Sequence, residues 1–301
     1  MSERKVIIGL PVYNGQKYLG AAIDSHLSQS FGDFDLVIAD NGSTDATAEI
    51  CAGYATQDKR IQYLRSTENR GILWNHRRVM EAIQSPKQYF RWAAADDILA
   101  PGFLAPMVAL LDARTEVAAV VPDAKNIDDK GEILGSMART LDLQCADVYE
   151  RARHVLVAEY QHVIAYGLLR ASTLRLMRTK PDYIGWDPIF VWELALRGQL
   201  VQPAGPVLLR RLHAGSISRV KTAKEMRKWV EPNSNVGMNF PHWTWAYERV
   251  RVLLAAPLPM RARLRIALLL ARATMWDRGS LTRDVKQAAR RTLGLSDEYT
   301  F

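Results

Sequence analysis

Short apolar runs alternate with longer amphipathic segments through about the first 120 residues of the chain. The runs are typical of buried strands, and the segments, whose apolar residues recur at helical spacing, are typical of helices. The predicted strands cover residues 5–12, 34–40, 61–64, 89–95 and 117–121, and the predicted helices cover residues 18–27, 46–54, 72–83 and a segment after Pro101. Because strands that alternate with helices form βαβ units, we expect an α/β fold with a mostly parallel central sheet and flanking helices.

The alternation weakens after about residue 123. Asp-Asp-Lys-Gly at residues 128–131 indicates a hairpin turn, and residues 141–157 are helical or irregular. We expect helices over residues 171–177 and 186–197, two short strands within residues 200–211, a polar link over residues 233–240, and helices over residues 243–256, 260–276 and 281–293. The chain therefore divides into an α/β domain, residues 1–219, and a helical C-terminal extension, residues 220–301.

The composition is that of a globular protein with a sizeable core, since 48% of the 301 residues are hydrophobic and 24% are charged. Neither a signal peptide nor an apolar stretch long enough for a membrane span is visible. The cysteines Cys51 and Cys145 lie far apart without metal-binding spacing, which suggests reduced thiols. We expect a cytoplasmic protein.

The excess positive charge lies entirely in the C-terminal extension. Residues 220–301 hold 15 Lys and Arg against 7 Asp and Glu, whereas residues 1–219 hold 25 of each kind, which gives the net charge of +8. Residues 260–276 combine Arg261, Arg263 and Arg265 with a Leu/Ile/Ala face, a pattern typical of a helix lying on an anionic membrane leaflet. The alternative is a helix packed on the α/β domain with solvated arginines. We expect no nucleic-acid partner, because no nucleic-acid-binding motif accompanies the charge.

Acidic residues fall where predicted strands end or helices begin. Asp96 and Asp97 close the apolar run 89–95, Asp40 closes another, and Asp187 opens a helix. An α/β fold can bring these positions to one sheet edge, where ligands bind. There an early carboxylate can accept a hydrogen bond from a nucleobase or ribose, a central pair can hold a cation on a diphosphate, and a later carboxylate can act as a general base.

Each of these residues also has a purely structural interpretation. Asp97 could cap the helix that follows Pro101, and Asp187 could cap its own helix. Asp40 could shape a turn, in which Ser43 or Thr44 would cap the next helix. These alternatives stay open at the level of the residues alone.

Six motifs follow one another along the chain: GLPVYNG (9–15), VIADNGSTD (37–45), ENRG (68–71), WAAADDIL (92–99), IGWDPIFVWELALRG (184–198) and RRLHAGSIS (210–218). Together they resemble the family 2 glycosyltransferases, inverting enzymes with the Rossmann-like GT-A fold, over about residues 4–219. The resemblance implies transfer of a sugar from a nucleotide-diphosphate donor to an acceptor hydroxyl, with Mn²⁺ or Mg²⁺ as cofactor.

The resemblance also implies a role for each matching residue. Asp187 matches the catalytic base, and Asp97 and His213 match metal ligands. The residues that match donor-binding positions are Pro11, Tyr13, Asn14, Asp40, Asn41, Gly71, Asn75, Asp96 and Arg211. UDP is the favoured nucleotide, since Asp40 could accept a hydrogen bond from a uracil N–H.

The chain departs from the family pattern at three places, the first of which is the central motif, Ala95-Asp96-Asp97 in place of a literal Asp-x-Asp. Trp186 stands where an acidic residue usually precedes the base, and residues 123–159, where acceptor recognition would lie, match no known motif. We expect a glycan or lipid-linked acceptor of cell-envelope type, and attachment to the cytoplasmic membrane face if the extension binds lipid. A nucleotidyltransferase needs a glycine-rich basic loop after the first strand, and PVYNGQKY has one glycine and one lysine. A non-catalytic protein that binds anionic surfaces is the other alternative.

Overall fold

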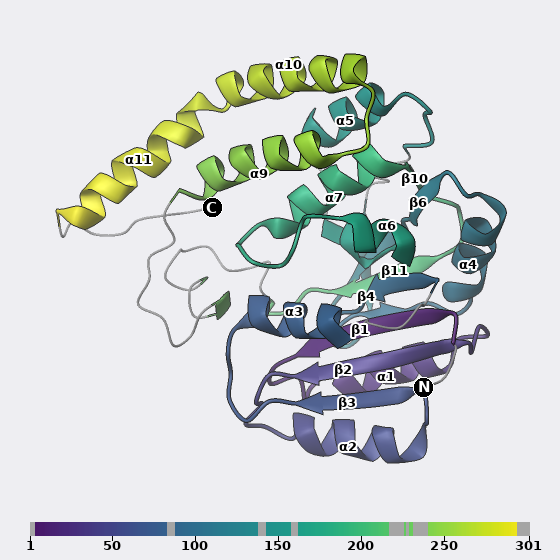
Figure 1. The fold of residues 1–301 in the computed structure, drawn as a ribbon. Helices are drawn as coiled ribbons and strands as arrows, with labels where there is room; N and C mark the ends of the chain where they lie inside the picture. Colours follow the sequence, from purple (N-terminus) through teal and green to yellow (C-terminus); the bar gives the residue numbers. More distant parts are fainter. Residues whose placement is uncertain are drawn as a thin grey trace.

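A seven-stranded sheet lies at the centre of the molecule (Figure 1). The computed structural model describes residues 4–82, 88–137, 143–157, 162–216, 226, 229–230 and 240–293. The strand order is β10-β6-β9-β4-β1-β2-β3, with β1 (Val6–Val12), β2 (Phe34–Asp40), β3 (Ile61–Arg65), β4 (Tyr89–Trp92), β6 (Val117–Val120), β9 (Leu168–Arg170) and β10 (Gln199–Val201). Among these described strands β9 alone runs antiparallel to its neighbours. The expectation of a mostly parallel sheet is confirmed.

Helices cover both faces of this sheet because successive side chains of each strand point to opposite sides. In β1, Ile8 and Leu10 pack with α1 (Leu19–Leu27), α2 (Thr47–Gln57) and α4 (Leu104–Ala113). Ile7 belongs to a second buried cluster with α3 (Ile72–Ala82), α5 (Val148–Val157) and α7 (Trp186–Arg197). The helices and strands predicted from the apolar pattern lie within a few residues of their expected bounds.

A second, four-stranded sheet was not predicted from the sequence. Its order is β5-β11-β7-β8, with β5 (Ile98–Leu99), β7 (Asp123–Ile127), β8 (Ile133–Ser136) and β11 (Val207–Arg211). The predicted hairpin turn joins β7 to β8, where the Asp128 carboxylate accepts hydrogen bonds from the N–H groups of Lys130 and Glu132. Through β5 and β11 this sheet borders the acidic pair.

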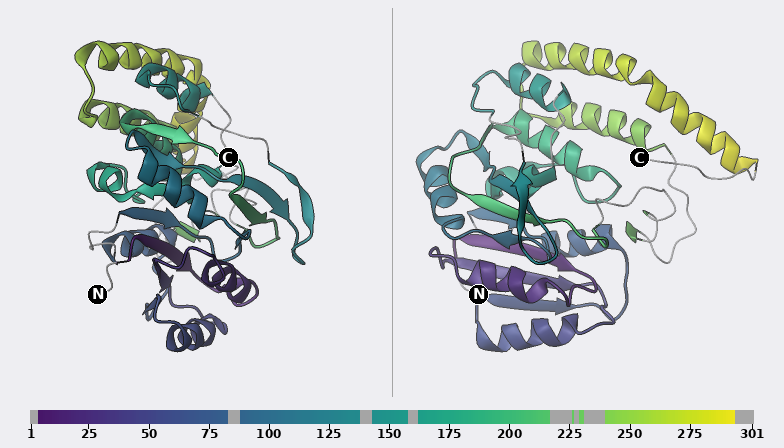
Figure 2. Two further views of the ribbon diagram at one scale, coloured as in Figure 1. Left: turned by 90° about the vertical axis from the view of Figure 1, so that its right-hand side faces the viewer. Right: turned by 180° about the vertical axis from the view of Figure 1, so that it is seen from behind.

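The C-terminal extension packs on the α/β domain as α9 (Pro241–Ala255), α10 (Met260–Trp276) and α11 (Arg278–Thr292). Leu253 of α9 and Ile266 of α10 join the buried cluster that contains Trp192 of α7. Figures 1 and 2 show α10 and α11 along one edge of the molecule, outside α5 and α9. Among the described residues, no helix is both long and apolar enough to cross a bilayer.

Some predictions fall outside the described residues. The proposed domain boundary at residue 219 is one, and most of the polar link over residues 233–240 is another. The segment predicted as helical or irregular contains the bridge residue Leu143 and then α5, while residues 138–142 are not described. The remaining short elements are η1 (His162–Tyr166) and α6 (Ala171–Leu176), of which α6 was predicted.

Candidate active site

The direction in which strands are added to the main sheet reverses at β1. The chain runs from β1 to β2 and β3 on one side, and β4 then pairs with the other side of β1. At such a switch point the loops that follow the two strands separate and leave a crevice at their carboxyl ends. The loop after β1 begins at Tyr13, and the loop after β4 carries Asp96 and Asp97.

Two adjoining cavities open at this edge. One, which we call the N-terminal cavity, has a volume of about 610 Å³. The predicted site residues that line it are Pro11, Tyr13, Asn14, Asn41, Asn75, Asp96 and His213. These residues come from distant parts of the chain, so the fold brings together most of the predicted donor-binding set.

The other, which we call the C-terminal cavity, has a volume of about 620 Å³. Asp97, Asp187 and Arg211 line it, together with the aromatic rings of Trp186 and Trp245. The residues that line both cavities are Ile72, His76, Ala94, Asp96, Tyr166 and Ser216. Asp96 therefore lies at the junction, with Asp187 on the C-terminal side of it.

The acidic pair is held by contacts with the second sheet. Asp96 Oδ2 lies 2.9 Å from His213 Nε2, and Asp97 Oδ1 accepts a hydrogen bond from the Arg211 backbone N–H at 2.9 Å. Burial of the Asp97 carboxyl and the negative charge of Asp96 raise the pKa of Asp97 to about 7. The helix-cap alternative for Asp97 is excluded, because β5 follows it directly and α4 begins only at Leu104.

The Arg211 guanidinium donates hydrogen bonds to main-chain carbonyls. Nε donates to the Asp96 carbonyl at 3.0 Å, and Nη1 donates to the carbonyls of Asp128 and Asp129 at 2.7 and 3.1 Å. The guanidinium also lies 4.7 Å from the centre of the Tyr18 ring. These contacts connect the loop that carries Asp96 and Asp97 to the turn between β7 and β8. Arg211 therefore stabilises that loop and also lines the C-terminal cavity.

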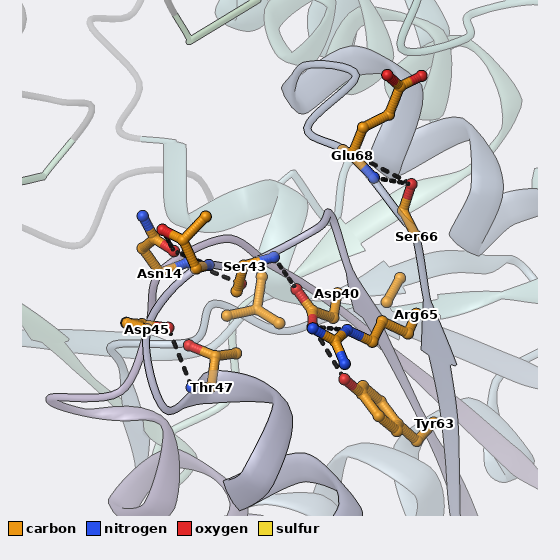
Figure 3. Close-up of polar contacts among 12 residues, drawn as sticks. Asn14, Asp40, Ser43, Asp45, Thr47, Tyr63, Arg65, Ser66 and Glu68 are labelled. Carbon is orange, nitrogen blue, oxygen red and sulfur yellow. Dashed lines mark hydrogen bonds and ion pairs between the residues drawn. The ribbon is translucent and has the colours of Figure 1, made fainter.

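Asp40 lies under the turn that follows β2 (Figure 3). Its side chain is fully buried: Oδ1 accepts a hydrogen bond from the Ser43 N–H, Oδ2 accepts one from the Tyr63 hydroxyl, and the residue lines neither cavity. The turn-shaping interpretation of Asp40 fits these contacts. Its neighbour Asn41 lines the N-terminal cavity instead.

The same turn is joined to the loop after β1. The Asn14 N–H donates to Ser43 Oγ at 2.9 Å, and Asn14 Oδ1 accepts from the Thr44 N–H at 2.9 Å. The expectation that Ser43 or Thr44 caps the next helix is wrong, because these residues bind Asn14. The N-cap of α2 is Ala46, and the carboxylate of the preceding Asp45 accepts a hydrogen bond from the Thr47 N–H at 3.0 Å (Figure 3).

Asn41 and Asn75 connect this turn to α3. Asn41 Nδ2 donates to the Asn69 side chain and to the Gly71 carbonyl, at 2.8 and 3.1 Å. Gly71, just ahead of α3, has a φ of +89° and lines neither cavity. Asn75 Nδ2 donates to the Ala39 carbonyl at 2.7 Å, while its buried Oδ1 has no hydrogen-bond partner among the described residues. Asn75 therefore offers an acceptor at the wall of the N-terminal cavity.

Asp187 lies in the first turn of α7, whose N-cap is Gly185. A carboxylate is favoured there by the partial positive charge at a helix N-terminus. Gly185 has a φ of +72°, and a Cβ at this position would lie 2.6 Å from the Trp245 ring. Trp245 Nε1 also donates to the Ile184 carbonyl at 2.9 Å, so α9 fixes the segment that carries Asp187.

Two titratable residues that line both cavities were not predicted from the sequence. Tyr166 lines both cavities, and burial together with the charges of Asp97, Asp96 and Asp187 raises the pKa of its hydroxyl. His76 also lines both, and burial lowers its pKa, with the charge of Asp187 acting in the opposite direction. His76 could have been found because it follows Asn75 at the start of α3. Tyr166 lies outside every motif.

The side chains available here include the carboxylates of Asp96, Asp97 and Asp187 and the imidazoles of His76 and His213. Among the residues that the structure describes, no group of three His, Cys, Asp or Glu side chains is arranged to hold a metal ion. Asp96 Oδ2 and His213 Nε2, two possible donors to a cation, lie 2.9 Å apart. Carboxylate oxygens suit Mn²⁺ and Mg²⁺, and Mg²⁺ is commonly held by one or two carboxylates together with substrate phosphates.

Residues 7–165 match the model of the family described as Glycosyl transferase family 2. The chain belongs to this family. The resemblance drawn from the six motifs is thereby confirmed.

Glycosyltransferase GlyA of Streptococcus pneumoniae serotype 4 is 38% identical over 70 residues, which are 23% of this chain and 10% of that protein. Glycosyltransferase GlyG of the same organism is 37% identical over 71 residues, 24% of this chain and 23% of its own. Each alignment thus spans less than a quarter of the relative's length.

Solved structures of S. aureus TarS share the fold of this chain. TarS 1-349 in complex with UDP-GlcNAc superposes with a TM-score of 0.63 at 15% identity, covering 90% of this chain and 72% of that one. The complex of TarS 1-349 with UDP gives a TM-score of 0.61 at 14% identity, and the match covers 91% of this chain and 73% of the TarS chain. The likeness confirms the GT-A fold.

Proposed function

We propose that this glycosyltransferase moves a sugar from a nucleotide-diphosphate donor in the N-terminal cavity to an acceptor hydroxyl in the C-terminal cavity. The observation that carries the proposal is the junction of two cavities of about 610 and 620 Å³ at Asp96, with Asp187 lining only the second. This arrangement places a candidate base on the acceptor side and an acidic pair between the two substrates.

The donor's base would lie against Pro11, Tyr13 and Asn14 in the N-terminal cavity. UDP remains the favoured nucleotide, with the acceptor for the uracil N–H supplied by Asn41, because Asp40 is buried and its oxygens are engaged. The side-chain oxygen Oδ1 of Asn41 accepts one hydrogen bond, from the Arg70 backbone N–H, and has a second lone pair. The UDP and UDP-GlcNAc complexes of TarS support this choice. Asn75, at the wall, would face the ribose and diphosphate.

Asp187 would act as the general base. As the acceptor oxygen forms its bond to the anomeric carbon, the bond from that carbon to the diphosphate oxygen breaks, and the electron pair leaves with the nucleotide. The acceptor proton passes to Asp187. Attack from the face opposite the diphosphate inverts the anomeric configuration. His76, whose pKa is lowered by burial, and Tyr166 would line the space between the reactants.

Asp97 and His213 are the proposed protein ligands of Mn²⁺ or Mg²⁺, with Asp96 beside His213 as a third donor. Diphosphate oxygens and water would complete a shell that the protein supplies only in part. A divalent ion bound there would offset negative charge on the departing diphosphate. Arg211 would keep Asp96 and Asp97 in place through its contacts with their loop.

The acceptor would be a glycan or a lipid-linked glycan of cell-envelope type, and the transferred sugar a hexose or an N-acetylhexosamine. Trp186 and Trp245 line the C-terminal cavity. Indole rings offer an apolar face with a polar edge, which suits the face of a sugar ring. Trp186 is the better placed of the two, because it directly precedes Asp187.

A calorimetric titration tests the donor site. UDP, GDP and TDP are titrated into the protein with Mn²⁺ and with EDTA, and into the variants Asp97→Ala and Asp123→Ala, the latter outside both cavities. We expect UDP to bind most tightly, and EDTA or Asp97→Ala, but not Asp123→Ala, to weaken binding. If no nucleoside diphosphate binds under any of these conditions, the proposal fails.

A further inference from the structure

The outer face of α10 carries a row of exposed apolar side chains. Met260, Leu264, Leu268 and Met275 are spaced four, four and seven residues apart, which places them on one side of the helix. Their exposed fractions are 63%, 58%, 64% and 66%. The opposite side of α10 is buried through Ile266 and Leu270. Packing on the rest of the protein therefore explains only one face of this helix.

Basic side chains border this apolar row. Arg261, Arg265 and Arg272 are exposed and lie along one flank of it on the helix surface. Arg265 pairs at 3.6 Å with Asp147, the residue before α5, and lies 4.3 Å from the centre of the Tyr149 ring in α5, so it marks the edge of the exposed face.

The following helix continues the positive surface. The exposed basic residues of α11 are Arg278, Arg283, Lys286 and Arg290. Asp284, an acidic residue within the described part of α11, is buried against His242 and offsets none of this exposed charge. We call the apolar row of α10 and the basic residues of α10 and α11 the amphipathic edge.

We propose that the amphipathic edge docks on an anionic lipid surface. The row of α10 would enter the boundary between headgroups and acyl chains, and the arginines would lie at the level of the headgroups. A second copy of this chain fits less well, because bringing two such edges together would oppose arginine to arginine. The long apolar row also distinguishes this surface from one built for nucleic acid.

The arrangement of the helices makes docking sterically possible. Both views of Figure 2 show α10 and α11 on the outside of the molecule, with α9 and α5 between them and the central sheet. A flat surface could approach this edge without displacing the helices that hold α7. The proposal does not depend on sugar transfer, so its outcome is separate from that of the nucleotide titration.

Flotation of the full chain with lipid vesicles tests the proposal. Vesicles of phosphatidylcholine are compared with vesicles that also contain phosphatidylglycerol, at low and high salt. We expect binding only to the anionic vesicles, and weaker binding at high salt. The double variant Leu264→Ser/Leu268→Ser should weaken binding about tenfold or more for each leucine. Arg261→Gln/Arg272→Gln should weaken it about fivefold for each arginine at low salt.

A matched control comes from α9, where Tyr247 and Leu254 are 65% and 63% exposed. Tyr247→Ser/Leu254→Ser removes a similar exposed apolar area away from the arginine flank and should leave vesicle binding within about twofold of the wild type, well under the expected loss for one leucine. Equal loss in both double variants, or no binding to anionic vesicles by the wild type, overturns the proposal. A wild-type dimer in light scattering that Leu264→Ser/Leu268→Ser converts to a monomer overturns it in favour of a second copy.

Discussion

Asp40, the last residue of β2, and its neighbour Asn41 have different surroundings at the proposed donor site. Asp40 is fully buried and accepts hydrogen bonds from the Ser43 N–H and the Tyr63 hydroxyl, whereas Asn41 lines the N-terminal cavity. The Asp40 carboxylate therefore stabilises the turn after β2, and Asn41 is available to a ligand in the N-terminal cavity. Since Tyr63 comes from β3, the shape of this turn depends on the pairing of β2 with β3.

Replacement of Asp40 tests the structural part of this division. Asp40→Asn should lower the free energy of unfolding by about 1–3 kcal/mol, because a buried charged acceptor becomes a neutral amide whose NH₂ has no acceptor in place. Tyr63→Phe removes only one of the two hydrogen bonds and should cost about 1 kcal/mol. Urea denaturation measures both variants. An unchanged unfolding midpoint for Asp40→Asn would show that the buried contacts do not stabilise the turn.

The limits of sequence reasoning are clearest at this scale. Asp40 and Asp96 both follow apolar runs and look equivalent in the sequence, yet one is buried beneath a turn and the other lies between two cavities. The difference arises from Tyr63 and His213, which reach these carboxylates from 23 and 117 residues away. Tyr166 was missed for the same reason, since its place among three carboxylates is a tertiary property.

At the scale of elements, α7 depends on a close contact with α9. Gly185 has a φ of +72° beneath the Trp245 ring, immediately before the turn that carries Asp187. Neither property is visible in the sequence, which predicted the helix but not what holds its start. The unpredicted strands β5 and β9 illustrate the same limit, because two and three residues carry no usable periodicity.

Gly185→Ala should therefore damage catalysis more than donor binding. The left-handed backbone costs a non-glycine residue about 1–2 kcal/mol, and the new Cβ would overlap the indole ring at 2.6 Å. We expect lower stability and a lower kcat with unchanged nucleotide affinity. Gly279→Ala is the matched control, because that glycine lies within α11 with nothing within 4 Å of a Cβ, and it should stabilise the protein slightly. Equal effects of both substitutions would contradict this account of α7.

A buried pair between α1 and β4 predicts a loss of stability at acidic pH. His26 Nε2 accepts a hydrogen bond from Arg91 at 2.9 Å, and burial, with the charge of Arg91, lowers the pKa of His26 from 6.5 to about 3. Below pH 6.5 the unfolded chain binds a proton that the folded protein excludes. The contribution to stability is therefore complete above pH 6.5 and declines at up to about 1.4 kcal/mol per pH unit as the pH falls towards 3.

The variant His26→Gln should remove this part of the pH dependence, because glutamine does not titrate. Between about pH 7 and pH 4 only the unfolded chain binds this proton. As the pH is lowered over that range, the free energy of unfolding should fall less steeply for His26→Gln than for the wild type. His154→Gln, at an exposed position of α5, serves as the control and should leave the slope unchanged. Parallel curves for all three proteins would exclude His26 as the source.

At the scale of the whole molecule, the C-terminal helices share the core of the α/β domain. Val252, Leu253 and Ile266 belong to the same buried cluster as Phe190 and Trp192 of α7. The helices of the extension were predicted from their apolar pattern, but the face that packs inward was not, since α10 is apolar on both sides. This buried cluster therefore contains residues from both sides of the predicted boundary at residue 219.

Because these helices share one core, we expect the protein to unfold in a single cooperative transition in differential scanning calorimetry. Leu253→Ala should shift the whole transition, at a cost of about 2–5 kcal/mol, because it opens a cavity beneath α9. The neighbouring Leu254 is 63% exposed, so Leu254→Ala should change stability by less than about 0.5 kcal/mol. Two separate transitions, with only one moved by Leu253→Ala, would contradict the shared core.

The central claim, that Asp187 is the base for sugar transfer, is tested most directly by the rate of nucleotide release from the donor that the wild type uses. Asp187→Asn should lower kcat about 10²–10⁴-fold. Its nucleotide affinity should remain that of the wild type, because Asp187 lines only the C-terminal cavity. A variant that turns over at nearly the wild-type rate, or that loses nucleotide binding together with activity, would contradict the account.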